Sequence, residues 1–142
     1  MEKILLEFID TLDSSFKKLL ENVRSTSGVS QLTISQFQYI DAIHELGEPT
    51  ITEIAEKLAI TKASATTGIN KLVEKGYLNK TQSAQDKRIF HVSLTDTSRQ
   101  LIEAKYQALK EYGEFIQAAL SEEEVKQFET IMTKLVKRFK QI

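Results

Sequence analysis

Residues 50–76 read TITEIAEKLAITKASATTGINKLVEKG and carry the clearest structural pattern of the chain. Its apolar residues follow a helical spacing in two short blocks, and the final glycine stands where a glycine ends a helix. Thr50 or Thr52 can cap the first block and Thr61 the second, because a threonine hydroxyl accepts a hydrogen bond from an unpaired N–H group of the first turn. Two short helices joined by three or four residues predict a helix-turn-helix over about residues 52–75.

The hydrophobic period changes from 3.6 to 2 after this segment. Residues 77–81 and 89–94 are rich in β-forming residues, and the second run alternates apolar with polar side chains. Residues 82–87 between them are too many for a two-residue turn and include no Asn-Gly or Asp-Gly pair. We therefore predict a β-hairpin over about residues 77–94 with a flexible tip. Such a hairpin after a helix-turn-helix forms a winged helix.

Two helices are predicted before this segment. Apolar residues recur every three or four positions from Ile4 to Val23, which indicates a long amphipathic helix. Residues 25–31 are rich in serine and predict a loop. Thr33 and Gln36 then fit a capping box, in which each side chain accepts a hydrogen bond from the other residue's N–H group. The helix that they begin ends at Gly47.

Two further helices follow the hairpin. Thr95 can cap a helix of about 25 residues, and Ser121 with Glu124 forms a capping box for the last helix. The wide apolar stripes of residues 1–24 and 95–142 need a partner surface. Because a two-fold interface is the commonest way to bury such stripes, we expect these helices to interlock with those of a second copy. A monomeric bundle in which they cover one another is the alternative.

Composition excludes several classes of protein. The 142 residues include no cysteine, so disulfide scaffolds, thiolate zinc sites and cysteine nucleophiles are excluded. No apolar run approaches the roughly 18 to 20 residues that span a membrane, and the first residues do not resemble a secretion signal. We therefore expect a soluble, cytoplasmic protein of one domain that binds no membrane.

The net charge of −1 hides an asymmetry. Residues 50–91 carry seven basic and four acidic side chains, a net charge of +3, and the rest of the chain is correspondingly acidic. A basic middle between acidic ends is expected when only the middle faces an anionic surface such as nucleic acid. Ordinary scatter of charges is the alternative.

The outward face of the second predicted helix suits duplex DNA. Ala65, Ile69 and Leu72 mark its buried side, so small hydrogen-bonding residues occupy the opposite side. Serine and threonine hydroxyls can reach phosphates or base edges, Asn70 can pair with adenine through two hydrogen bonds, and Lys71 can meet phosphate or guanine. Simple solvent exposure would also explain the hydroxyl residues. The candidate contacts on this helix are Ser64, Thr66, Thr67, Asn70 and Lys71.

The wing supplies a second set of candidate contacts, Asp86, Lys87 and Arg88. Arg88 could enter the minor groove, and Asp86 could hold its guanidinium group in place. An ordinary surface ion pair is the alternative. Such pairs contribute little stability, so stability alone explains this pair poorly.

In their order and spacing these segments resemble the MarR family of bacterial and archaeal winged-helix transcription regulators. The resemblance implies a homodimer that binds a palindromic operator, commonly as a repressor that a small molecule releases. By position it places the candidate residues above on the recognition helix and the wing. The segments that carry it are Leu32–Phe37, Ile51–Leu58, Ala65–Leu72, Lys75–Leu78, Asp86–Arg88 and Val92–Thr95.

The chain departs from the family pattern at three positions. Gly68 stands where a larger aliphatic residue is usual, Thr67 where arginine is common, and Ser98 where glycine is frequent. The substitution at Thr67 alters the side chain that would face the bases. Candidate residues for a small-molecule pocket are Phe16, Phe37, Tyr39, His44 and the residues that follow Thr95.

Other functions have weaker support. We find no phosphate-binding loop, nucleophile elbow or H-E-x-x-H motif, so we do not expect an enzyme or a cofactor. His44 and His91 are the two histidines, and no second histidine lies one turn from His44, so we expect no metal site. A metal-responsive regulator and a winged helix used for protein–protein assembly without DNA binding are the alternatives.

Overall fold

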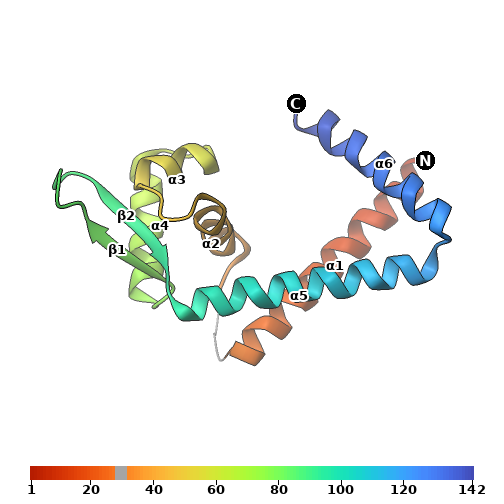
Figure 1. Ribbon diagram of the computed structural model, residues 1–142, viewed down its shortest axis with the longest axis horizontal. Helices are drawn as coiled ribbons and strands as arrows, with labels where there is room; N and C mark the ends of the chain where they lie inside the picture. Colours follow the sequence, from red (N-terminus) through yellow and green to blue (C-terminus); the bar gives the residue numbers. More distant parts are fainter. Residues whose placement is uncertain (28–31) are drawn as a thin grey trace. The chain divides into compact units, whose positions relative to one another are not determined.

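The computed structural model describes residues 1–27 and 32–142, without the side chains of Phe16, Leu19, Leu20 and residues 23–27. These described parts form six helices and a two-stranded antiparallel sheet (Figure 1), which confirms the expected mainly α fold with a hairpin wing. None of the helices in the described parts has the length and apolarity to cross a membrane. The elements are α1 (Glu2–Ser27), α2 (Ile34–Leu46), α3 (Ile51–Leu58), α4 (Lys62–Glu74), β1 (Leu78–Gln82), β2 (Phe90–Leu94), α5 (Asp96–Ala119) and α6 (Glu122–Phe139).

Local signals set the starts of the helices. The capping boxes of Thr33 with Gln36 and of Ser121 with Glu124 are both formed. Thr50, rather than Thr52, caps α3. The Thr61 hydroxyl accepts a hydrogen bond of 3.1 Å from the Ser64 N–H group and so caps α4. The predicted helix-turn-helix is therefore present, with three residues between its helices.

The two helices of this pair end in the same way, with different residues. At the end of α4, Gly76 has a φ of +83°, and the Tyr77 N–H group donates to the Leu72 carbonyl over 2.9 Å. At the end of α3, Ala59 has a φ of +54°, and the Ile60 N–H group donates over 3.0 Å to the Ala55 carbonyl. Both are Schellman endings, which favour glycine because a Cβ atom is disfavoured at positive φ. The turn of the helix-turn-helix therefore holds an alanine in a strained conformation.

The free edge of β2 is hydrogen-bonded to the residues just before α3. Leu78 pairs with Leu94 at the base of the hairpin, and the Val92 N–H group donates over 2.9 Å to the Pro49 carbonyl. An isolated bridge between Thr50 and His91 extends this contact. The wing is consequently hydrogen-bonded to the segment that begins α3.

One hydrophobic core unites the winged lobe, which we define as residues 32–105. Its members come from α2, α3, α4, the hairpin and the start of α5, so the amphipathic faces of these elements cover one another. The predicted lobe ended at residue 94, whereas Ser98, Leu101 and Ile102 of α5 are buried with it. The largest fully buried side chains include Ile40, Ile43, Ile54, Ile69, Leu72, Leu78, Val92 and Leu101.

The chain divides into two compact units, Met1–Lys105 and Tyr106–Ile142. In the first unit, α1 extends to Ser27, beyond the predicted end at Val23, and residues 28–31 of the predicted loop lie outside the described residues. In the second unit, α6 buries no side chain. Large apolar side chains are exposed along α1, the second half of α5, and α6, including Ile4, Leu5, Phe8, Leu109, Phe115, Ile131, Leu135 and Phe139.

Candidate nucleic-acid interface

The outward face of α4 is built as predicted. Ala65, Ile69 and Leu72 are completely buried, which turns the opposite side of the helix to solvent. Four of the five candidate residues on this helix are exposed, and Thr66 is half-buried. The exposed four are Ser64, Thr67, Asn70 and Lys71.

The hydroxyl groups on this face are already engaged. Thr66 Oγ1 donates to the Lys62 carbonyl over 2.8 Å, and Thr67 Oγ1 donates to the Ala63 carbonyl over 3.1 Å. Ser64 Oγ accepts from Thr61 Oγ1 over 2.9 Å. Because the hydroxyl of each threonine donates its hydrogen to a carbonyl of the same helix, it offers DNA an acceptor oxygen and a methyl group. Donation to a phosphate would require rotation of the hydroxyl.

Asn70 contacts the wing. Its Oδ1 atom accepts a hydrogen bond of 3.2 Å from Lys80 Nζ on β1. The same ammonium lies 4.5 Å from the centre of the Phe90 ring, within the range of a cation–π contact. Sequence spacing did not single out Lys80, and its position on the strand next to a polar helix face is the signal that could have found it.

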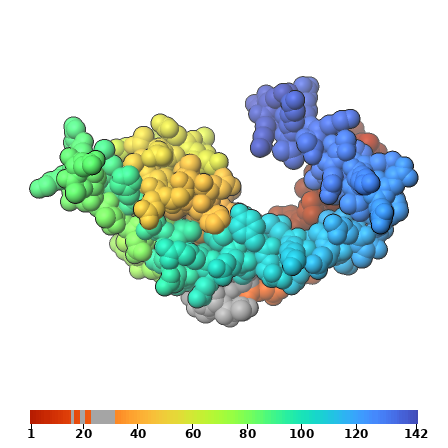
Figure 2. Space-filling model, in the orientation of Figure 1, coloured from red at the N-terminus to blue at the C-terminus, as the bar shows by residue number. Residues whose placement is uncertain are grey.

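The tip of the wing is an ordered turn rather than the flexible loop we expected. The Ser83 N–H group donates to the Ile89 carbonyl over 2.8 Å, and the Gln82 side-chain amide donates to the Lys87 carbonyl over 2.7 Å. These bonds link the two sides of the tip across the long connection. The space-filling view shows the wing, in green, projecting from the rest of the winged lobe (Figure 2).

Asp86 holds Arg88 as the sequence suggested. Arg88 Nε and Nη2 donate to the two carboxylate oxygens of Asp86 over 3.1 and 3.0 Å, and the Arg88 backbone N–H group donates to Asp86 Oδ1 over 3.0 Å. The guanidinium hydrogen bonds lower the pKa of Asp86 and raise the pKa of Arg88. The Arg88 side chain nevertheless remains 90% exposed, so the carboxylate orients a charge that is available to a ligand.

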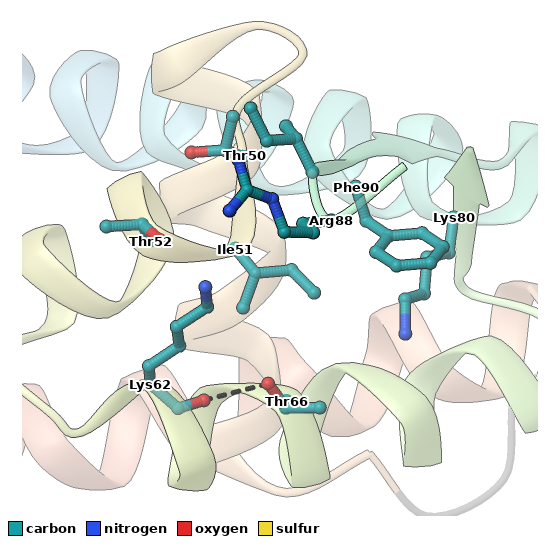
Figure 3. Close-up of a pocket in the computed structure, with 9 residues that line it drawn as sticks. Thr50, Ile51, Thr52, Lys62, Thr66, Lys80, Arg88 and Phe90 are labelled. Atoms are coloured by element: carbon teal, nitrogen blue, oxygen red, sulfur yellow. Dashed lines mark hydrogen bonds between the residues drawn. The ribbon is translucent and has the colours of Figure 1, made fainter. Parts of the chain in front are cut away.

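A hollow of about 460 Å³ lies between α3, α4 and the wing. Figure 3 shows the cationic ends of Lys62 and Arg88 directed into it from α4 and from the wing. Three positive charges and three threonines around an open hollow suit an anion such as a phosphate. Its lining comprises Thr50, Ile51, Thr52, Lys62, Thr66, Lys80, Arg88, Ile89 and Phe90.

Gly68 has a packing role that its sequence position did not reveal. The ring of Tyr39 on α2 lies against the backbone of α4, and a Cβ atom at residue 68 would come within 2.4 Å of its hydroxyl oxygen. That hydroxyl donates a long hydrogen bond of 3.5 Å to the Ser64 carbonyl. Burial raises the pKa of Tyr39. The absence of an aliphatic side chain at residue 68 therefore allows a tyrosine to position α4.

Ser98, the third departure from the family pattern, is a buried polar residue with a partner. Its hydroxyl donates to the Tyr77 carbonyl, which also accepts from the Thr95 N–H group over 3.2 Å and from Thr95 Oγ1 over 3.1 Å. Thr95 Oγ1 also lies 2.8 Å from the Gly76 carbonyl. The start of α5 is thus hydrogen-bonded to the segment between α4 and β1.

The suggested pocket residues divide between different places, although His44 and the start of α5 do share one hollow. Phe37 is buried in the core, and Tyr39 lines a hollow beside α4. His44 lines a different hollow of about 420 Å³ with Arg99 and Ile102. The Phe16 side chain lies outside the described residues.

Residues 1–27 and 32–142 hold no cluster of three metal-ligating side chains. His91 Nδ1 lies 3.2 Å from the Glu48 carbonyl oxygen.

Comparison with known proteins agrees with this geometry. The model of the MarR family matches residues 32–90. The HTH-type transcriptional regulator YhbI of Bacillus subtilis is 28% identical over 72% of this chain and 68% of its own length. The HTH-type transcriptional repressor MdtR of the same organism is 24% identical over 77% of each chain.

Solved structures extend the similarity along the chain. Streptococcus pneumoniae FabT, in a crystal structure with DNA, has a TM-score of 0.77 and 27% identity over 96% of this chain and 98% of its own. A mutant of S. aureus MepR has a TM-score of 0.71 and 22% identity over 98% of each chain, and it shows the shared fold. Both similarities include the terminal helices as well as the winged lobe.

Proposed function

We propose that this chain is a MarR-family transcription regulator, a repressor that binds a palindromic operator as a homodimer and is released by a small molecule. In this proposal, α4 enters the major groove and Arg88 on the wing enters the minor groove. The DNA contacts are Ser64, Thr66, Thr67, Asn70 and Lys71 on α4, and Asp86, Lys87 and Arg88 on the wing.

One observation carries the DNA-binding part of the proposal. The exposed polar face of α4 adjoins the hollow into which Lys62 and Arg88 direct their charges. A helix face that can read base edges, flanked by cations that can neutralise the backbone, is the combination that sequence-specific binding requires. The DNA complex of FabT, a protein with the same fold, supports this assignment.

The homodimer is supported by the exposed apolar residues of α1, α5 and α6. We assign residues 1–24 and 95–142 to dimerisation, although the first turns of α5 also belong to the core of the winged lobe. Two copies of α4 about 34 Å apart would meet successive major grooves on one side of a duplex.

The repressor assignment is supported by the name of MdtR, a relative over most of its length. Release by a small molecule rests on the family resemblance. Binding to genomic DNA would place the protein in the cytoplasm.

The primary test is selection of genomic fragments by the purified protein, followed by footprinting. The proposal expects protected regions with two-fold symmetry, and the neighbouring genes would then suggest compounds to test for release. A protected region without symmetry would contradict the dimeric mode, and failure to enrich any fragment would contradict DNA binding.

Arg88→Ala provides a test of the wing on any operator so found. We expect the affinity to fall roughly tenfold and the salt dependence to weaken by about two counterions per dimer, because each subunit loses one positive charge at the DNA interface. Arg99→Ala is the matched control, since Arg99 also forms an exposed ion pair close to it in sequence, with Asp96 on α5. Equal losses in the two variants would refute a specific role for the wing.

A further inference from the structure

Lys80 is held between the wing and α4 by two contacts. Its Nζ atom lies 3.2 Å from Asn70 Oδ1 and 4.5 Å from the centre of the Phe90 ring. Lys80 and Phe90 are both half-buried, and Phe90 packs against the hydrophobic core. The Phe90 ring on β2 therefore holds the ammonium group of Lys80 in place, and the Asn70 side chain turns its oxygen toward that group.

This contact determines which end of the Asn70 amide faces outward. An ammonium group donates hydrogen bonds and accepts none, so the atom of Asn70 that faces Lys80 must be the carbonyl oxygen. The NH2 group is then the end left for another partner. Asn70 itself is exposed on the outward face of α4.

The orientation alters the base that Asn70 can recognise. Pairing with adenine through two hydrogen bonds requires the amide oxygen to accept from N6 while the amide nitrogen donates to N7. Here the oxygen already accepts from Lys80, and the adjacent positive charge repels the N6 hydrogens of adenine. Guanine presents two acceptors, N7 and O6, so the outward NH2 group of Asn70 can donate to it, and the nearby Lys80 charge favours these acceptors.

We infer that Lys80 is a positioning residue that makes Asn70 prefer guanine to adenine at one base pair of each half-site. This inference rests on the proposed function, because it specifies how the recognition helix reads its operator. It replaces the adenine preference that the sequence suggested for Asn70.

The test is selection from a random duplex library by the full chain and its variants, with sequencing of the bound fraction. Asn70→Ala identifies the base pair that Asn70 reads, as the position whose preference disappears. At that position the wild-type protein should favour guanine over adenine by about fivefold or more. Lys80→Met should remove this preference or turn it toward adenine, and Lys80→Arg should retain it because arginine also donates hydrogen bonds.

Lys75→Met is the matched control, because it removes one lysine charge from the exposed end of α4. It should leave the guanine preference unchanged. Adenine at this position in the wild type, or the same preference in Lys80→Met as in the wild type, would overturn the inference and leave the proposed function intact. Enrichment of no duplex by the wild type would overturn the proposed function and the inference together.

A measurement without DNA tests the contact itself. The NMR signals of the Asn70 side-chain NH2 group can be assigned by their absence in Asn70→Ala. They should shift in Lys80→Met and remain in place in Lys75→Met. Unchanged signals in Lys80→Met would refute the hydrogen bond on which the inference depends.

Discussion

The helices of the winged lobe and α6 share the same spacing of apolar residues, but they differ in how far those residues are buried. Both carry apolar residues every three or four positions, but Ile69 and Leu72 of the lobe are fully buried, whereas Leu135 of α6 is 45% exposed. The helices of the lobe bury their apolar sides against other parts of the same chain. Periodicity therefore predicts a helix and its apolar side, but the same pattern arises whether the same chain or a second copy covers that side.

The largest effect should come from the core of the lobe. Leu72→Ala removes a fully buried side chain, and we expect it to lower the free energy of unfolding by about 2–5 kcal/mol. Urea denaturation should give this loss at every protein concentration, because the cavity lies inside one chain. A loss below about 1 kcal/mol would show that the lobe is less tightly packed than its burial indicates.

A substitution on α6 should instead affect the association of two chains. Leu135→Asp places a charge on the apolar stripe, and we expect the dimer dissociation constant to rise at least about a hundredfold, measured by analytical ultracentrifugation. Thr130→Asp adds the same charge to the opposite face of the helix and is the control. Equal association of the two variants would contradict a dimer interface on the apolar side of α6.

The contact between Tyr39 and Gly68 tests how closely α2 and α4 pack inside the lobe. Gly68→Ala should gain helix propensity, about 1 kcal/mol, but its Cβ atom meets the Tyr39 ring. We therefore expect the gain to appear in a Tyr39→Leu background and to be absent in the wild type. A double-mutant cycle in urea should give a coupling of about 1 kcal/mol or more, and additive effects would contradict the packing role of Tyr39.

The exposed tip of the wing should give the smallest effect. Because Arg88 lowers the pKa of Asp86 below its ordinary 3.8, the pair stabilises the folded chain above that ordinary value. The stabilisation is lost as the pH falls through the lowered folded pKa. An NMR titration of the Asp86 carboxyl carbon should show a higher midpoint in Arg88→Ala and an unchanged one in Arg99→Ala, and equal midpoints in wild type and Arg88→Ala would refute the pairing.

The sequence predicted the features that depend on neighbouring residues. The caps at Thr33, Thr61 and Ser121 and the glycine ending at Gly76 were all found, because each involves groups within a few positions. The buried face of α4 was found for the same reason. The engagement of the threonine hydroxyls was missed, although threonines within helices often donate to the carbonyl four residues earlier.

The features that the sequence did not predict join residues distant along the chain. Lys105 on α5 forms a partly buried ion pair of 2.8 Å with Asp41 on α2, a separation of 64 positions. The contacts of Tyr39 with Gly68 and of Lys80 with Asn70 likewise depend on how the helices pack. A single sequence shows such residues one at a time, and at most the place of Lys80 on a strand that follows the polar helix hints at its pairing with Asn70.

The three hydrogen bonds that meet at the Tyr77 carbonyl have a mechanical consequence. This oxygen follows the last turn of α4, precedes β1 and accepts from Thr95 and Ser98 at the start of α5. Displacing the hairpin alone would leave the buried Ser98 hydroxyl without its acceptor, which is costly, so we expect the start of α5 and the hairpin to move together as one block. For the proposed dimer, we expect that a compound releasing it from the operator changes the spacing between two such blocks and leaves the internal geometry of each intact.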